Sequence, residues 1–187
     1  AMIAVHVDDM NIIGPTEASV QEVLQKLKKH FKITTKSESL LGMAINEVNL
    51  GTVISQPFYS RKLLQKHDPQ DLLRPKHVPM NGNYKIDLDK KDEKALEVLG
   101  ALSHLSRYGR WDLLFAVNYL GSAPNFKACD VILRYLKYTL DSGFIFKKFI
   151  GEVPVLVAFS DAEFNRDNLG RSVGGHRLRL TTQGIYD

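Results

Sequence analysis

The chain has 187 residues, 44% of them hydrophobic and 25% charged, with a formal net charge of +4. These values are ordinary for a globular protein with one sizeable core or two small ones, and the mild basic excess is compatible with a nucleic-acid partner. The single cysteine, Cys129, excludes an internal disulfide framework and a cysteine-based zinc site. Because no apolar run of membrane-spanning length and no basic leader occurs, we expect an intracellular protein, cytoplasmic or nuclear, without a membrane partner.

The most informative stretch lies near the N-terminus, where Asp8 and Asp9 stand side by side between two apolar runs. Apolar residues alternate before the two acids and follow them again, which predicts a β-hairpin with the acids at its tip. Paired carboxylates offer the hard oxygen ligands that Mg²⁺ prefers. By itself, an Asp-Asp pair is more often a solvated turn, so the metal interpretation depends on the rest of the chain.

A helix is expected next, over residues 17–31, where apolar side chains recur at helical spacing. Thr16 is a suitable N-cap, and Ser19 follows three residues later. The outer face of this helix is basic and carries Lys26, Lys28, Lys29 and Lys32. Such a face is usually only solvated, and contact with nucleic-acid phosphates is the sharper alternative.

The middle of the chain changes from a β pattern to a helical one. Residues 41–45 and 52–55 predict a second hairpin, and Pro57 opens a helix that is expected to end near residue 67. The side chains expected to face inward from this helix are Phe58, Leu63 and Leu64. The following stretch, 68–93, combines prolines with scattered charge and predicts a linker.

Residues 93–143 predict a small bundle of three short helices, broken at Gly109 and again at Gly121. The side chains expected to face inward are Val98, Ala101, Leu102, Leu105, Leu113, Leu114, Val117, Leu120, Phe126, Cys129, Ile132, Leu133 and Leu136. Trp111 is expected to pack in this core rather than to offer a stacking surface. Cys129 is expected to be a buried thiol and not a reactive one.

The tail returns to a β pattern, with strands expected at 144–146, 155–160 and 172–180. Asp161 follows the second of these strands, and Gly174 with Gly175 predicts a bulge or bend in the third. The histidines show no zinc-ligand spacing, so no zinc site is assigned.

The order of these features resembles the reverse transcriptase of copia-type retrotransposons. The first hairpin resembles the catalytic Y-x-D-D motif, with His6 in place of the tyrosine, and Leu41-Gly42-Met43 is similar to the leucine-glycine hairpin of the primer grip. Further landmarks follow in the family's order: Ser55-Gln56 with Tyr59 (S-Q-x-x-Y), Val78-Pro79-Met80 (T-P-M), Leu99-Gly100-Ala101-Leu102 (L-V-G-A-L), Arg110-Trp111-Asp112 (R-P-D), residues 132–137 (I-L-R-Y-L-K), Ser160-Asp161-Ala162-Glu163-Phe164 (S-D-A-D-W) and Arg171-Ser172 (R-S).

The resemblance covers nearly the whole chain, with departures at Trp111, Glu163 and His176 that indicate a divergent copy. It implies an α+β fold in three parts. Residues 1–56 would be the C-terminal part of the palm, with β-hairpins and an amphipathic helix. Residues 57–143 would be a helical thumb or connection with the linker 68–93, and residues 144–187 would be the truncated start of an RNase H-like domain.

The resemblance also implies a set of site residues. Asp8 would be the principal metal ligand and Asp9 the secondary one, while Asp161 would be the first carboxylate of an RNase H remnant. The cofactor of the intact family enzyme would be Mg²⁺ or Mn²⁺, and its binding by this chain alone is left open. The remaining ligands would lie upstream of Ala1 and beyond Asp187. The expected nucleic-acid contacts are Lys28, Lys29, Lys32, Leu41, Gly42, Arg134 and Lys137.

The expected function is that of a fragment of a retrotransposon RNA-directed DNA polymerase that is inactive alone. Its partners would be an RNA or DNA primer–template and the missing segments of the polyprotein. One alternative is a non-catalytic, domesticated protein that binds nucleic acid through its basic helices. A second is an interaction module whose exposed strand edges pair with another copy.

Overall fold

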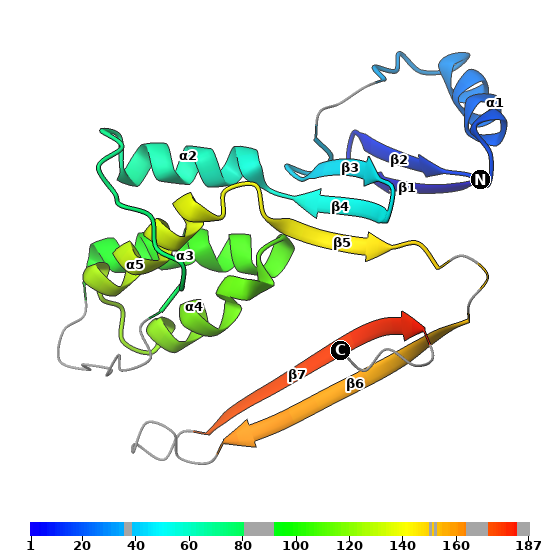
Figure 1. The fold of residues 1–187 in the computed structure, drawn as a ribbon. Helices are drawn as coiled ribbons and strands as arrows, with labels where there is room; N and C mark the ends of the chain where they lie inside the picture. Colours follow the sequence, from blue (N-terminus) through cyan, green and yellow to red (C-terminus); the bar gives the residue numbers. More distant parts are fainter. Residues whose placement is uncertain (36–38, 81–91, 150, 152, 164–171, 183–187) are drawn as a thin grey trace.

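The structure is a computed structural model that describes residues 1–35, 39–80, 92–149, 151, 153–163 and 172–182 (Figure 1). The helices are α1 (Glu17–Lys28), α2 (Pro57–His67), α3 (Glu93–Tyr108), the 3₁₀ turn η1 (Trp111–Leu113), α4 (Leu114–Gly121) and α5 (Phe126–Tyr138). The strands are β1 (Met2–His6), β2 (Asp9–Ile13), β3 (Ala44–Val48), β4 (Gly51–Ser55), β5 (Gly143–Lys147), β6 (Pro154–Glu163) and β7 (Val173–Thr182). The mixed helix and strand content confirms the α+β class.

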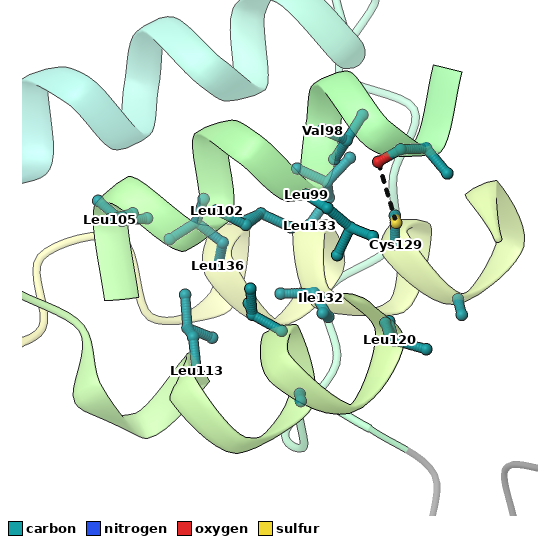
Figure 2. Close-up of a cluster of buried hydrophobic side chains, with 14 of the residues drawn as sticks. Val98, Leu99, Leu102, Leu105, Leu113, Leu120, Cys129, Ile132, Leu133 and Leu136 are labelled. Carbon is teal, nitrogen blue, oxygen red and sulfur yellow. Dashed lines mark hydrogen bonds between the residues drawn. The ribbon is translucent and has the colours of Figure 1, made fainter. Parts of the chain in front are cut away.

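The main hydrophobic core lies between α3, α4 and α5, with α2 packed against them (Figure 2). Its fully buried side chains include Val98, Leu102, Leu105, Leu113, Leu120, Ile132, Leu133 and Leu136. Side chains cap the starts of α3 and α5: Asp92 accepts from the Lys94 N–H at 3.0 Å, and Asn125 accepts from the Ala128 N–H at 3.3 Å. The predicted three-helix bundle is therefore confirmed in its positions and in most of its inward side chains.

Three aromatic or apolar side chains were expected to be inside and lie outside. Phe58 is 46% exposed, Trp111 is 55% exposed and Leu114 is 37% exposed. Phe58 precedes the buried Leu63 by five positions, which places it about 140° around α2. Trp111 lies in a 3₁₀ turn, which has three residues per turn, and α4 then continues with 3.6. Because the prediction assumed 3.6 residues per turn throughout, it placed Trp111 and Leu114 on the wrong face.

Cys129 is fully buried, as expected, and its Sγ lies 4.0 Å from the carbonyl oxygen of Ala95 (Figure 2). Burial raises the pKa of the Cys129 thiol to about 12, with a further contribution from the nearby Asp92 carboxylate. We therefore predict that a thiol reagent added at pH 8 leaves the folded chain unlabelled and labels it fully in denaturant, because only the thiolate reacts. The labelling is measured by mass spectrometry. Rapid labelling of the folded chain would contradict the burial of Cys129.

A three-stranded antiparallel sheet joins distant parts of the sequence, in the order β3–β4–β5. β5 follows the helical bundle and begins the segment interpreted as RNase H-like, yet it pairs with β4 of the segment interpreted as palm. Two glycines allow the close approach. A Cβ on Gly51 would lie 2.0 Å from the Phe146 carbonyl oxygen, and one on Gly143 would lie 2.3 Å from that of Ile54. Pairing in this sheet therefore holds β5, which follows the helical bundle, beside the second hairpin.

The remaining elements are two antiparallel ribbons, β1–β2 and β6–β7, and the helix α1. α1 ends at Lys28 and not at residue 31, so Lys32 lies beyond it, and none of its residues is buried. β7 is paired without a break through Gly174 and Gly175, so the expected bulge is absent there. Among the helices in the described part of the chain, none has the length and apolarity needed to cross a membrane.

Both ribbons expose apolar side chains that folded monomers usually cover. The exposed residues are Met2, Ile3, Val5, Val7, Met10 and Ile13 in or beside the first ribbon, and Val155, Leu156, Phe159, Val173, Leu178 and Leu180 in the second. A two-stranded ribbon is marginal by itself, and exposed apolar side chains in such numbers are uncommon in monomeric proteins.

Candidate functional site

The tip of the first hairpin places Asp8 and Asp9 next to each other, as the sequence predicts. β1 and β2 pair in register from Met2 with Ile13 to His6 with Asp9, so the turn consists of Val7 and Asp8 alone. Asp8 is exposed and Asp9 is partly buried. Val7 has φ 55°, in the left-handed region that a β-branched residue rarely adopts. The hairpin thus presents one carboxylate, Asp8, from a strained two-residue turn, and the next, Asp9, from the first position of β2.

The second predicted tip, Leu41-Gly42, is also a tight turn. Leu40 and Met43 exchange both backbone hydrogen bonds, at 2.8 and 2.9 Å, and the two residues between them have φ 53° and 76°. Positive φ at both central positions is the pattern of a type I′ turn. The expected strand 41–45 therefore begins only at Ala44, and Leu41, which is 46% exposed, stands at the tip.

Left-handed backbone is concentrated at these two tips. Within the described ranges, the non-glycine residues with positive φ are Val7, Leu41 and Asp71. Aspartate tolerates this conformation, whereas valine and leucine do so at a cost of about 1–3 kcal/mol each. Such strain is found preferentially at functional sites. It coincides here with the two turns that resemble the catalytic motif and the primer grip.

The strain at the first tip can be measured directly. Changing Val7 to glycine should slow amide hydrogen exchange across β1 and β2 about fivefold, because relief of about 1 kcal/mol of backbone strain stabilises the turn. The matched control is Val48→Gly, which removes the same side chain from extended strand β3 and should speed exchange in β3 and β4. Faster exchange in the first hairpin of Val7→Gly would show that Val7 is not strained.

The carboxylates at the first tip are the predicted metal ligands. Asp8 and Asp9 offer adjacent oxygen ligands, but across the described ranges no three His, Cys, Asp or Glu side chains come together to hold a metal ion. The residues present therefore do not fit a complete two-metal site, which needs a larger set of oxygen ligands.

Asp161, the expected RNase H remnant, lies within β6 opposite Gly175. It is exposed, and its Oδ1 accepts from the Ala162 N–H at 2.9 Å. Far from the first hairpin in the sequence, it lies on a separate ribbon (Figure 1). The neighbouring family landmarks at Phe164 and Arg171, and the acids Asp167 and Asp187, lie outside the described residues.

The predicted basic residues near α1 are exposed. Lys28 closes the helix, Lys29 is its C-cap, and Lys32 follows in the next loop. Within the described residues no acidic side chain pairs with these three lysines, whereas Lys26 is held by Glu22 at 2.7 Å. Their ammonium groups are therefore available to a phosphate backbone.

The predicted basic residues of α5 have partners within the chain. Arg134 pairs with Asp130 at 2.7 Å, and Lys137 contacts Asp68 at 2.9 Å and Asp71 at 2.7 Å. The two aspartates raise the pKa of Lys137. Burial opposes ionisation of Asp68, but hydrogen bonds from Lys137 and from two backbone N–H groups lower its pKa overall. A nucleic acid would have to compete with these contacts, so the contribution of Arg134 and Lys137 to binding stays a prediction.

Sequence reasoning missed a buried network around Arg110, which is 1% exposed. Its Nε lies 3.0 Å from Asp112 Oδ1, its Nη2 lies 2.7 Å from Asp112 Oδ2, and its Nη1 donates to the Thr139 carbonyl oxygen at 2.9 Å. The guanidinium also lies 5.7 Å from the centre of the Tyr135 ring. The available signal was the R-x-D spacing, which allows such a side-chain pair across one residue.

No protein-family model matches the chain, and no solved structure matches it.

Proposed function

We propose that the chain is a segment of a copia-type reverse transcriptase, which contributes the Asp8-Asp9 hairpin of the palm, a helical thumb or connection, and the start of an RNase H-like domain. The observation that carries the proposal is that backbone strain occurs at the two hairpin tips whose sequences resemble the family's motifs. Val7 and Leu41 hold unfavourable backbone conformations at the two hairpin tips that resemble the catalytic motif and the primer grip.

The exposed surfaces support the same proposal. A palm segment would share its sheet with neighbouring strands, and the β1–β2 ribbon exposes apolar side chains on a sheet with no third strand among the described residues. In the same way, the β6–β7 ribbon would be the first hairpin of a larger sheet. Missing polyprotein segments are thus the proposed partners of both ribbons.

Asp8 and Asp9 would bind the divalent cation in the assembled enzyme, with Mg²⁺ or Mn²⁺ supplying charge stabilisation for nucleotidyl transfer. In this chain their own contribution is to hold two negative charges at adjacent positions, Asp8 in the exposed turn and the partly buried Asp9 at the start of β2. Because the described residues supply only these two carboxylates at the tip, we expect the 187 residues alone not to extend a primer.

A second candidate function is nucleic-acid binding without catalysis, in a protein derived from such an element. The observation that favours it is the set of exposed lysines, Lys28, Lys29 and Lys32, which have no acidic partner in the described part of the chain. Both candidates require nucleic-acid binding, and only the first requires the carboxylates at the hairpin tip.

Binding is tested by fluorescence anisotropy with a labelled RNA–DNA primer–template over a range of salt concentrations. We predict binding at low salt that weakens steeply as salt rises, because each phosphate contact releases a counterion. Replacing Lys28, Lys29 and Lys32 together with glutamine should weaken binding and reduce the salt slope by about one unit per lysine that contacts a phosphate.

The matched control replaces three exposed lysines of the helical bundle, Lys62, Lys94 and Lys127, with glutamine. The two triple variants therefore have the same net charge. The control should leave the salt slope close to that of the unchanged chain. Equal effects of the two triple variants would mean that only net charge matters, and no binding at low salt would contradict both candidate functions.

A further inference from the structure

The β6–β7 ribbon has two outer strand edges. Its strands pair over their full length, from Pro154 with Thr182 to Glu163 with Val173, and no third strand joins either of them in the described part of the chain (Figure 1). Bulges and internal prolines protect such edges in many proteins. Here the pairing is unbroken, and the one proline stands at the first position of β6. The ribbon can therefore accept a further strand at either edge.

The two faces of this ribbon differ in charge, because successive side chains of a strand alternate between faces. One face, which we call the charged face, carries two acids from β6 and two arginines from β7: Asp161, Glu163, Arg177 and Arg179. The opposite face, which we call the neutral face, receives no Asp, Glu, Lys or Arg side chain from either strand. Leu156, Leu178 and Leu180 on the neutral face are 63%, 63% and 59% exposed. An added strand must therefore match charges on one face and apolar side chains on the other.

The register of the ribbon leaves two opposite charges unmatched. Asp161 lies opposite Gly175, and Arg177 lies opposite Phe159. Asp161 accepts a hydrogen bond from the Ala162 N–H at 2.9 Å, and within the described ranges neither Asp161 nor Arg177 has an ion-pair partner. Acids and arginines are thus separated between the two strands, with the acids on β6 and the arginines on β7.

The outer edge of β6 is complementary to the outer edge of β7 in another copy of the ribbon. A two-residue shift from the ribbon's own register keeps every side chain on its face. With this shift, Asp161 of one copy lies opposite Arg177 of the other on the charged face. On the neutral face, Ala158 then lies opposite Leu180 of the other copy. Opposite charges that face each other across two strands stabilise their pairing.

Pairing between identical edges does not have this complementarity. Two β7 edges would bring the arginines of both copies together, and like charges across strands are destabilising. Two antiparallel β6 edges would place Asp161 and Glu163 of each copy against the uncharged half of the other strand, so no charge would be matched. The distribution of charge therefore favours pairing between unlike edges.

We propose that a second copy of this chain adds its β7 to the outer edge of β6, with Asp161 opposite Arg177 of the second copy. Because each copy keeps one β6 edge and one β7 edge, the contact is head-to-tail and produces an open series of copies rather than a closed dimer. This inference goes beyond the proposed function and does not rest on it, since the contact involves neither nucleic acid nor a metal ion. A strand from a further polyprotein segment would compete for the same edge.

The first test is sedimentation velocity of the unchanged chain without nucleic acid, over a wide range of protein concentration. At low salt, the weight-average sedimentation coefficient should rise with concentration and pass the value of a dimer. High salt should weaken the assembly, because it screens charges that are exposed in the separate copies. A monomer at every concentration, or a coefficient that levels off at the dimer, would overturn the proposal.

The second test exchanges the two charges. Asp161→Lys and Arg177→Glu each place like charges opposite each other, so each variant alone should assemble with a dissociation constant about tenfold higher. An equal mixture of the two variants should restore assembly, because every contact between unlike variants again joins opposite charges. The matched control is Lys127→Glu at an exposed position on α5, which changes the net charge by the same amount as Arg177→Glu and should leave assembly unchanged.

The outcomes separate this inference from the proposed function. Circular dichroism shows whether the variants fold, and the salt dependence of the unchanged chain decides the question even if they do not. Folded variants that fail to assemble on mixing, or that assemble separately as well as the unchanged chain, would overturn the pairing of Asp161 with Arg177. Binding of primer–template by a chain that stays monomeric would overturn only the self-pairing and leave the proposed function intact.

Discussion

Replacing Arg110 with methionine is expected to lower the free energy of unfolding by about 3 kcal/mol, the lower end of the cost of breaking a buried ion pair. Methionine fills much of the same space but leaves the Thr139 carbonyl oxygen and the Asp112 carboxylate without their donor. The Asp112 side chain is 36% exposed and can be rehydrated, which keeps the loss at that lower end. Urea unfolding followed by circular dichroism measures the change.

Two variants make the Arg110 result interpretable. Arg61→Ala breaks the exposed pair with Asp141, whose side chains are 52% and 76% exposed, and should cost less than about 1 kcal/mol. Arg110→Lys keeps the charge but not the planar fork, so an intermediate loss is expected. If Arg110→Met unfolds at the same urea concentration as the unchanged chain, the network does not stabilise the junction between the bundle and β5.

Leu102→Ala is expected to lower the free energy of unfolding by about 3 kcal/mol, because it leaves a cavity in the buried core between the helices. Leu102 is fully buried on α3 in the core shown in Figure 2. The matched control is Leu96→Ala on the same helix, where the side chain is 56% exposed, and its cost should be close to zero. Equal costs for the two variants would contradict the position of the core.

Local signals in the sequence predicted the starts of α1 and α2 and the end of α3, whereas the predicted end of α1 was wrong by three residues. The Thr16 hydroxyl accepts from the Ser19 N–H at 3.3 Å in a reciprocal capping box, Pro57 opens α2, and Gly109 closes α3. These features act within a few residues, so their chemistry can be inferred from spacing. The fully buried positions on α3 and α5 followed from helical periodicity for the same reason.

The features that sequence reasoning missed depend on distant contacts or on irregular backbone. Lys137 pairs with Asp68, 69 residues earlier, and β5 pairs with β4 from the other side of the helical bundle. The 3₁₀ turn at Trp111 breaks the period on which its predicted burial depended. At the hairpin tips, the motif predicted where Asp8 would lie, but not the left-handed backbone of the residue before it.

We propose that Asp8 and Asp9 belong to a polymerase site that other segments complete. It is tested by primer extension with Mg²⁺, using the chain alone and the chain fused in frame behind copia-type fingers and upstream palm. We expect no extension by the chain alone, extension by the fusion, and loss of extension in the fusion carrying Asp8→Asn. Extension by the chain alone, extension unaffected by Asp8→Asn, or no extension by a fusion that folds and binds primer–template would contradict it.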